Sequence, residues 1–127
     1  MNVLRTPDRI QTGKQGEDLA VAYLKKEGYV VIERNYRCLF GEVDIVAKDG
    51  DTIVFVEVKS RRSDRFGEPQ MAVGLEKQKR ISRISLKYLE DRHLYPCNAR
   101  FDVVAVKIMP EGGKVELIRN AFELAFG

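Results

Sequence analysis

Asp44, Glu57 and Lys59 are three charged side chains in a stretch whose other residues are mostly suited to burial. Side chains of a β-strand alternate between its two faces, so Glu57 and Lys59 share a face. Two clustered carboxylates repel each other unless a cation lies between them. We therefore expect Asp44 and Glu57 to bind Mg²⁺ or Mn²⁺, which would activate water for phosphodiester hydrolysis. Lys59 would orient that water or stabilise charge on the phosphate.

The geometry of this set depends on a hairpin between the two strands. Asp49-Gly50 is a signal for a two-residue loop, which would place Asp44 opposite Phe55 and Glu42 opposite Glu57. A four-residue loop gives the same register, whereas a three-residue loop breaks it. Asp44 and Glu57 would then be diagonal neighbours about 7–8 Å apart, a gap that two carboxylates and one divalent ion can fill.

Glu17 is a fourth candidate for the site. Its helical position coincides with those of Ala20, Val21 and Leu24, which predicts that it faces inward. An inward carboxylate needs a partner, and a metal-bound water or Lys59 would serve. The alternative is an ordinary salt bridge at the helix edge. Composition alone does not decide between a site residue and a salt bridge.

An alternating Glu-Val-Lys triplet on a strand is, by itself, more often a solvated face with a cross-strand ion pair than an active site. Three further features favour the active site. An aspartate lies thirteen residues before Glu57, apolar residues flank each charge, and a basic run follows directly.

Two helices and five strands would position these residues. Thr12 and Gln15 match a capping box for a helix over 13–27, and Gly28 ends it. Residues 75–92 predict an amphipathic helix, and its buried face carries Ile81, Ile84, Tyr88 and Leu89. Hydrophobic runs bounded by turn residues predict the strands, which cover 29–37, 42–48, 52–60, 101–108 and 114–119.

The order α-β-β-β-α-β-β predicts an α/β fold with three layers, in which helices flank a mixed central sheet. We expect one domain over residues 1–127, with a core of about 12–120, because 127 residues with 44% hydrophobic content suit one globular unit. The segment from Arg61 to Gln70 is the one loop long enough to act as a mobile functional element.

The composition also limits where the protein works. No apolar run approaches the ~18 residues of a membrane helix, and the first residues are too polar for a secretory signal, so we expect a cytoplasmic protein without a membrane partner. Cys38 and Cys97 are expected to be reduced thiols. His93 is the single histidine, which leaves little room for histidine-based metal or triad chemistry.

Positive charge is concentrated in one part of the chain. The net charge is +3, but residues 59–92 carry ten basic and five acidic residues, a balance of +5. Such a patch beside an acidic site fits a polyanionic partner, although charge alone fits a solvated helix face equally well. The candidate nucleic-acid-binding residues in this segment are Arg61, Arg62, Lys77, Arg80, Arg83 and Lys87.

Several motifs in order resemble a known family. The runs GKQGEDLAVAYLKKEGYVVIERNYR, GEVDIVAKDG, FVEVKSRR and FDVVAV are similar to the YraN-like bacterial family, which is itself similar to archaeal Holliday junction resolvases. An aspartate followed by Glu-Val-Lys across a hairpin also resembles the PD-(D/E)xK nuclease superfamily, with its restriction-endonuclease-like core. The resemblance spans roughly residues 12 to 108, and family membership alone does not establish an activity.

The resemblance implies a role for individual residues. It places the metal-binding acids at Asp44 and Glu57, the catalytic lysine at Lys59 and the helix acid at Glu17. It also implies a metal contact from the backbone carbonyl of Val58. The proline that gives the superfamily its name is absent before the aspartate, and many members of the superfamily lack it.

Three further positions match the family pattern. Arg37, beside the hairpin, is a candidate phosphate contact. Asn35 and Asp102 match the pattern without an assigned role, and Asp102 could simply pair with an arginine.

These features predict a metal-dependent endonuclease that hydrolyses phosphodiester bonds in branched or structured DNA. The alternative is a non-catalytic nucleic-acid-binding module that keeps the fold, and an RNA-directed nuclease would use the same residues. A branched junction offers two equivalent cleavage points, so its cleavage would call for a homodimer. Tyr95, Phe122 and Phe126 are apolar enough to form an interface, although a tail packing on its own sheet is the more common outcome.

Overall fold

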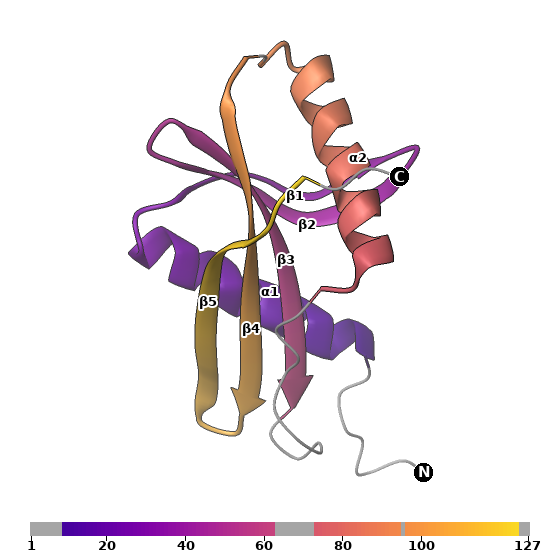
Figure 1. Cartoon of the computed structure of the whole chain (residues 1–127). Helices are drawn as coiled ribbons and strands as arrows, with labels where there is room; N and C mark the ends of the chain where they lie inside the picture. The colour runs from indigo at the N-terminus through magenta and orange to yellow at the C-terminus, as the bar shows by residue number, and fades with distance from the viewer. Residues whose placement is uncertain (1–8, 63–72, 95, 125–127) are drawn as a thin grey trace.

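One mixed sheet of five strands lies between two helices in the computed structural model, which describes residues 9–62, 73–94 and 96–124 (Figure 1). The elements are α1 (Arg9–Lys26), β1 (Val30–Cys38), β2 (Gly41–Asp49), β3 (Thr52–Arg62), α2 (Leu75–Asp91), β4 (Asn98–Met109) and β5 (Gly112–Phe122). The strands follow chain order across the sheet. Only β3 and β4 are parallel among neighbouring strands, and α2 lies in the connection between them. The predicted α/β class is confirmed.

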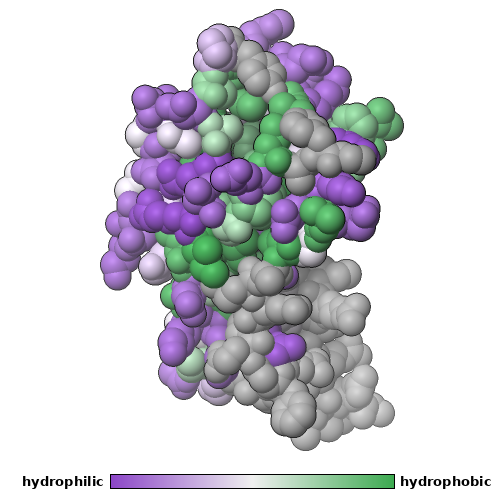
Figure 2. Space-filling view, in the orientation of Figure 1, coloured by the Kyte–Doolittle hydropathy of each residue, from purple (hydrophilic) through white to green (hydrophobic). Residues whose placement is uncertain are grey.

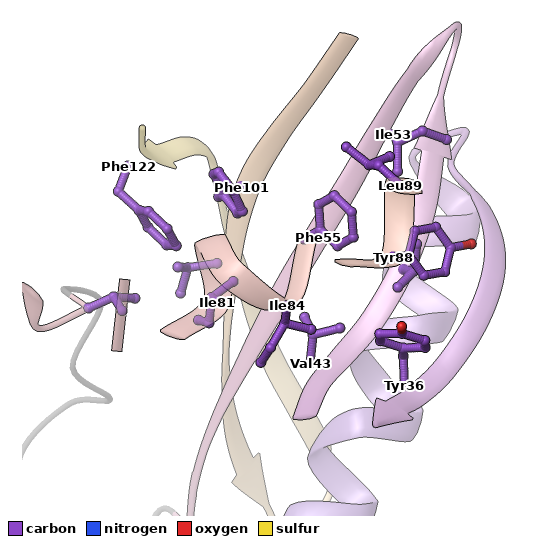
Figure 3. Packing of buried hydrophobic residues seen from close by; sticks show 13 residues of the cluster. Tyr36, Val43, Ile53, Phe55, Ile81, Ile84, Tyr88, Leu89, Phe101 and Phe122 are labelled. Carbon is purple, nitrogen blue, oxygen red and sulfur yellow. The ribbon is translucent and has the colours of Figure 1, made fainter. Parts of the chain in front are cut away.

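Each helix covers one face of the sheet with its own hydrophobic core. On one face, Ala20 and Leu24 of α1 pack with strand residues such as Val54 and Val56. On the other face, α2 packs on an aromatic cluster (Figure 3), in which the Tyr88 ring meets the rings of Tyr36 and Phe55 edge to face. The predicted inward positions of α2 are confirmed, since these residues are buried: Ile81, Ile84, Tyr88 and Leu89.

Gly28 ends α1 as predicted. Its φ of +94° is open to glycine at little cost, and the Tyr29 N–H donates to the Leu24 carbonyl at 2.9 Å, which is a Schellman-type closure. The predicted start was wrong. Helix α1 begins at Arg9, so Thr12 lies inside it and is not the N-cap, because the residues before Thr12 continue the helix.

The predicted hairpin register was wrong by two residues. Asp49 pairs with Thr52, so the loop is Gly50-Asp51 and Gly50 takes the left-handed conformation at φ +63°. Ile45 consequently lies opposite Val56. Asp44 and Glu57 are therefore not diagonal neighbours, and they are the residues that follow the last pair of the two strands.

Other boundaries moved by a few residues. Strand β4 begins three residues before the expected 101–108, and β5 is longer at both ends than 114–119, because the two strands pair along most of their length. Most of the expected 61–70 loop lies outside the described residues, as do Tyr95 and Phe126. Phe122 packs on the sheet of its own chain, where its ring stacks on that of Phe101. In the part of the chain that the structure covers, neither helix is long and apolar enough to cross a membrane.

Helix α1 lies close against β3 at Gly16. A Cβ at Gly16 would lie 1.7 Å from the Ser60 Oγ and 2.6 Å from its Cβ, so no other residue fits without moving the helix. Gly16 directly precedes Glu17, and Ser60 directly follows Lys59. This contact therefore sets how near Glu17 comes to β3, which carries Glu57 and Lys59.

We predict that Gly16→Ala destabilises the protein by about 1–3 kcal/mol, because overpacking forces α1 off the sheet. Gly13→Ala is the matched control, since a Cβ at Gly13 meets nothing within 4 Å. It should raise the free energy of unfolding by up to about 1 kcal/mol through helix propensity. Urea unfolding of both variants measures the difference, and equal effects would contradict the close contact.

Candidate active site

Strands β2 and β3 separate at the candidate site. Their paired residues run from Asp49–Thr52 to Ile45–Val56, and no further pair of these two strands follows among their described residues. Beyond this point β2 stays paired with β1, whereas β3 stays paired with β4 as far as Arg62. Figure 1 shows the β1–β2 hairpin running across the view beneath α2 while β3 turns alongside β4. Asp44 and Glu57 are the next residues on the two strands, at this fork.

Asp44 closes the fork through its side chain. The Val58 N–H of β3 donates to Asp44 Oδ2 at 2.8 Å. A buried backbone N–H needs an acceptor, and at the fork a carboxylate of β2 takes the role that a β2 carbonyl would play in a regular ladder. The bond fixes the Asp44 side chain between the two strands.

Burial and the neighbouring carboxylate of Glu57 both disfavour ionisation of Asp44. The pKa of Asp44 is raised to about 7, chiefly by burial and next by the negative charge of Glu57, and hydrogen bonding to Glu57 also raises it. The Val58 N–H bond acts in the opposite direction, and Glu17 adds a smaller increase. Asp44 and Glu57 therefore lie next to each other, as predicted. Glu17 is near enough for its negative charge to raise the pKa of Asp44.

Glu57 forms an ion pair with a cation of α2. It is buried, at 6% exposure, and its Oε2 forms an ion pair with the ammonium of Lys77 from α2. A buried carboxylate needs such compensation. Lys77 was predicted as a nucleic-acid contact, and the structure shows a nearer partner for it.

Glu17 is held by β1. Its Oε1 accepts hydrogen bonds from Arg34 Nε and Asn35 Nδ2, both at 3.0 Å. Asn35 has φ +55° in the middle of β1, between the pairs Arg34–Ile45 and Tyr36–Val43. Of the two partners considered for Glu17, the structure shows the salt bridge. Sequence reasoning missed this role of Arg34 and Asn35, and the signal for it was an asparagine inside a strand, a residue type that strands disfavour and that tolerates positive φ.

Lys59 and Val58 complete the set on β3. Lys59 is half-buried and, two residues beyond Glu57, on the same side of the strand by alternation. Val58 offers its N–H to Asp44, while the metal contact of its carbonyl stays a prediction. Within the described ranges, no three Asp, Glu, Cys or His side chains are close enough to bind one metal ion. Two hard carboxylates that repel each other suit Mg²⁺ or Mn²⁺, which take few protein ligands and fill the rest with water and phosphate.

The candidate phosphate-binding residues divide into three groups. Lys77, Arg80, Arg83 and Lys87 all lie on α2, and Arg80 packs against Gly41 at the start of β2. Arg37 is exposed on β1 and pairs with Glu42 at 2.5 Å. The third group lies at the end of β3 and consists of Arg61 and Arg62.

Asp102 belongs to a separate structural network. Its fully buried carboxylate accepts hydrogen bonds from the Tyr29 hydroxyl at 2.7 Å and from Arg100 Nε at 3.0 Å. The expected pairing with an arginine is confirmed. Burial and the neighbouring carboxylate raise the pKa of Tyr29 to about 12. Arg100 also donates to Asp49 at the β2–β3 turn, which ties this network to the loop end of the hairpin.

Comparison with known proteins assigns the family. A sequence model described as "Uncharacterised protein family UPF0102" matches residues 16–106, well over half of the chain. The chain belongs to the UPF0102 family. A UPF0102 protein of Syntrophus aciditrophicus is 62% identical over 98% of both chains, and one of Geobacter sulfurreducens is 53% identical over 90% of both. One of Caldicellulosiruptor saccharolyticus is 46% identical over 88% of this chain and 97% of its own. The YraN-like assignment is thereby confirmed.

We predict that removing the Asp44 charge stabilises the metal-free UPF0102 protein at neutral pH. The folded pKa of Asp44 lies above its unfolded value, so the folded state binds more protons between about pH 4 and pH 7 and loses stability as pH rises through that window. The loss is on the order of 3–4 kcal/mol. Asp44→Asn keeps an acceptor for the Val58 N–H and should not show this loss of stability with rising pH.

Urea unfolding in EDTA at pH 4 and pH 8 measures the effect. The variant and the native protein should have similar stability at pH 4, and the variant should be the more stable at pH 8. A native protein that gains stability relative to Asp44→Asn as pH rises would contradict the raised pKa.

We also predict that Lys77 competes with a metal ion for Glu57 in this UPF0102 protein. Lys77→Met leaves Glu57 without its ammonium, so Mn²⁺ should bind about two- to fivefold more tightly, the scale of a solvent-screened ion pair. Lys79→Met is the control, because Lys79 pairs with Glu76 on the same helix at 3.8 Å. Isothermal titration calorimetry measures the affinities, and weaker Mn²⁺ binding by Lys77→Met would overturn the competition.

Proposed function

We propose that this UPF0102 protein is a metal-dependent endonuclease of the PD-(D/E)xK type that hydrolyses phosphodiester bonds in branched or structured DNA. The observation that carries the proposal is the meeting of Asp44 and Glu57 at the strand fork, where each carboxylate raises the electrostatic cost of the other. A protein that needed only stability would gain little from burying this pair. A buried carboxylate with a strongly raised pKa, such as Asp44 beside a second acid, favours a functional site.

The arrangement of the layers supports the superfamily. A mixed sheet lies between α1 and α2, as in a restriction-endonuclease-like core, and the candidate acids come from a hairpin and the preceding helix in the expected chain order. The fold alone would not carry an activity. The two carboxylates at the fork, Asp44 and Glu57, give more specific support for a nuclease.

Each residue has a defined part in the proposed chemistry. Asp44 and Glu57, with the Val58 carbonyl, would hold the ion, and Asp44 keeps its orientation through the Val58 N–H. A bound Mg²⁺ or Mn²⁺ would supply an activated water and neutralise phosphate charge. Lys59 would orient the nucleophile or stabilise charge in the transition state. Glu17, fixed by β1, adds negative charge beside the ion.

Binding of DNA would depend mainly on phosphate contacts. The basic residues of α2 lie on the same side of the sheet as Glu57, because Lys77 reaches that carboxylate. Contacts to phosphates position a protein on DNA without reading sequence, and they make affinity fall steeply with salt. We therefore infer binding that depends on DNA shape.

One observation favours a second candidate function, a non-catalytic nucleic-acid-binding module. Lys77 already neutralises Glu57 in the metal-free protein, so the acid cluster is compatible with a site that never recruits an ion. This module would bind DNA or RNA without a metal and cleave neither.

We predict cleavage of labelled four-way, flap or nicked DNA in Mn²⁺, with a linear duplex and an RNA hairpin as comparison substrates. Lys59→Ala should lower the rate at least about 100-fold, the scale of a lost acid–base or electrostatic group, while binding stays within about twofold. Asp44→Asn should also be inactive. Lys48→Ala is the control, because Lys48 is exposed on β2 near the loop end of the hairpin.

Absence of cleavage of every substrate, together with metal-independent binding, would replace the nuclease by the binding module. Preferred cleavage of the RNA hairpin would redirect the proposal to RNA. Gel filtration at micromolar concentration tests the homodimer that junction cleavage calls for, and a stable monomer would remove four-way junctions as the substrate.

A further inference from the structure

Leu39 and Phe40 form an exposed apolar turn between β1 and β2. Their exposures are 88% and 40%, the first being the highest among the described large hydrophobic residues. Figure 2 shows a hydrophobic knob at the right margin, where Figure 1 places this turn. Tight turns usually carry polar residues or glycine, and a pair of neighbouring exposed apolar side chains beside polar ones marks a contact surface.

The turn is held in a fixed position against α2. Gly41 follows Phe40 with φ +132°, a conformation that L side chains rarely adopt, and a Cβ there would lie 3.3 Å from the Arg80 side chain and 3.5 Å from that of Ile84. The backbone after Phe40 therefore packs directly on the helix. The Phe40 ring is presented at a defined place on the surface.

Two adjoining grooves lie between this turn and α2. The larger, of about 520 Å³, is lined by Leu39, Phe40, Arg83, Leu86, Lys87 and Glu90. The smaller, of about 270 Å³, is lined by Phe40, Glu76, Lys79, Arg80 and Arg83. Phe40 and Arg83 take part in both. The larger volume is in the range that accommodates a small organic group.

The charges around Phe40 favour an anionic partner. Basic residues outnumber acidic ones in the lining of both grooves. An aromatic ring among guanidinium and ammonium groups is the combination with which proteins bind single-stranded nucleic acid, since the ring stacks on a base while the cations contact phosphates.

Helix α2 contributes residues both to the grooves and to the proposed active site. Lys77 contacts Glu57, and Arg83 follows six residues later on α2, about 9 Å along the helix axis. That length corresponds to about two or three nucleotide steps of 3.4 Å along one strand. A strand bound at the fork would therefore reach Phe40 within a few nucleotides of the cleaved bond.

We propose that the groove between the β1–β2 turn and α2 binds an unpaired nucleotide of the substrate, with its base stacked on Phe40 and its phosphates on the basic residues of α2. The inference rests on the proposed nuclease function and specifies its substrate as DNA with unpaired bases near the cleavage point. A fully paired duplex would leave Phe40 without a base to stack on. The groove thereby gives a physical reason for a preference for branched DNA.

Fluorescence anisotropy in EDTA tests the proposal without cleavage, using a fork with unpaired nucleotides and a paired duplex of equal length. Phe40→Ala should weaken fork binding about tenfold, the scale of one stacked base, and leave duplex binding within about twofold. Phe40→Tyr keeps the ring and should restore fork binding. Ile32→Ala is the control, because Ile32 is exposed on β1 at 46% and lines neither groove. A 2-aminopurine at the unpaired position should be quenched by the native protein and not by Phe40→Ala.

Equal affinity losses for fork and duplex, an unchanged fork affinity, or no measurable fork binding would overturn the proposal. A native dimer that Phe40→Ala converts to a monomer, with fork affinity unchanged, would make the turn an interface between two copies of the chain. Different results would reject the nuclease proposal and the stacking proposal. Base stacking without any Mn²⁺-dependent cleavage would reject the nuclease alone, and cleavage with fork binding insensitive to Phe40 would reject the stacking site alone.

Discussion

The backbone of β3 must find a hydrogen-bond acceptor where β2 leaves it, and the structure around the candidate site depends on how this need is met. The acceptor of the Val58 N–H is the carboxylate of Asp44. An acid is thereby fixed between two strands, in a place where burial favours its protonated form. Glu57, the residue before Val58, is a second acid, so Asp44 would serve both the backbone and the proposed chemistry.

Each acid near the fork has a different kind of partner. Asp44 has a backbone amide, Glu57 has Lys77 from α2, and Glu17 has Arg34 and Asn35 from β1. These partners come from different layers of the molecule, so the site exists only when both helices are docked. Asp102 shows the contrast, because its buried carboxylate is bound by Arg100, Tyr29 and a backbone amide at once. Such a network stabilises the fold. Because the charge of Asp102 is already balanced, a bound cation would gain little there.

Local rules predicted much of this fold, and non-local contacts account for what was missed. Alternation placed Glu57 and Lys59 on one face, and helical spacing identified the buried side of α2, including Tyr88. The hairpin register was wrong because Asp49-Gly50 and Gly50-Asp51 are both plausible turns, and only the strand pairs decide between them. The Lys77–Glu57 pair joins residues twenty positions apart in two different elements, β3 and α2. No sequence pattern indicated which α2 cation would reach the fork.

The single parallel pair of the sheet has a consequence for the order of folding. The two strands that carry the acids form a hairpin of sequence neighbours, whereas β3 joins β4 by pairing Thr52 with Asn98, 46 positions later. Contacts between near neighbours form before those that close long loops. The hairpin acids therefore meet before the crossover helix delivers its ammonium. A nascent hairpin would hold two carboxylates before Lys77 reaches Glu57, and protonation of one of them would favour its formation. The proposed divalent ion would act in the same way, which would couple its binding to folding.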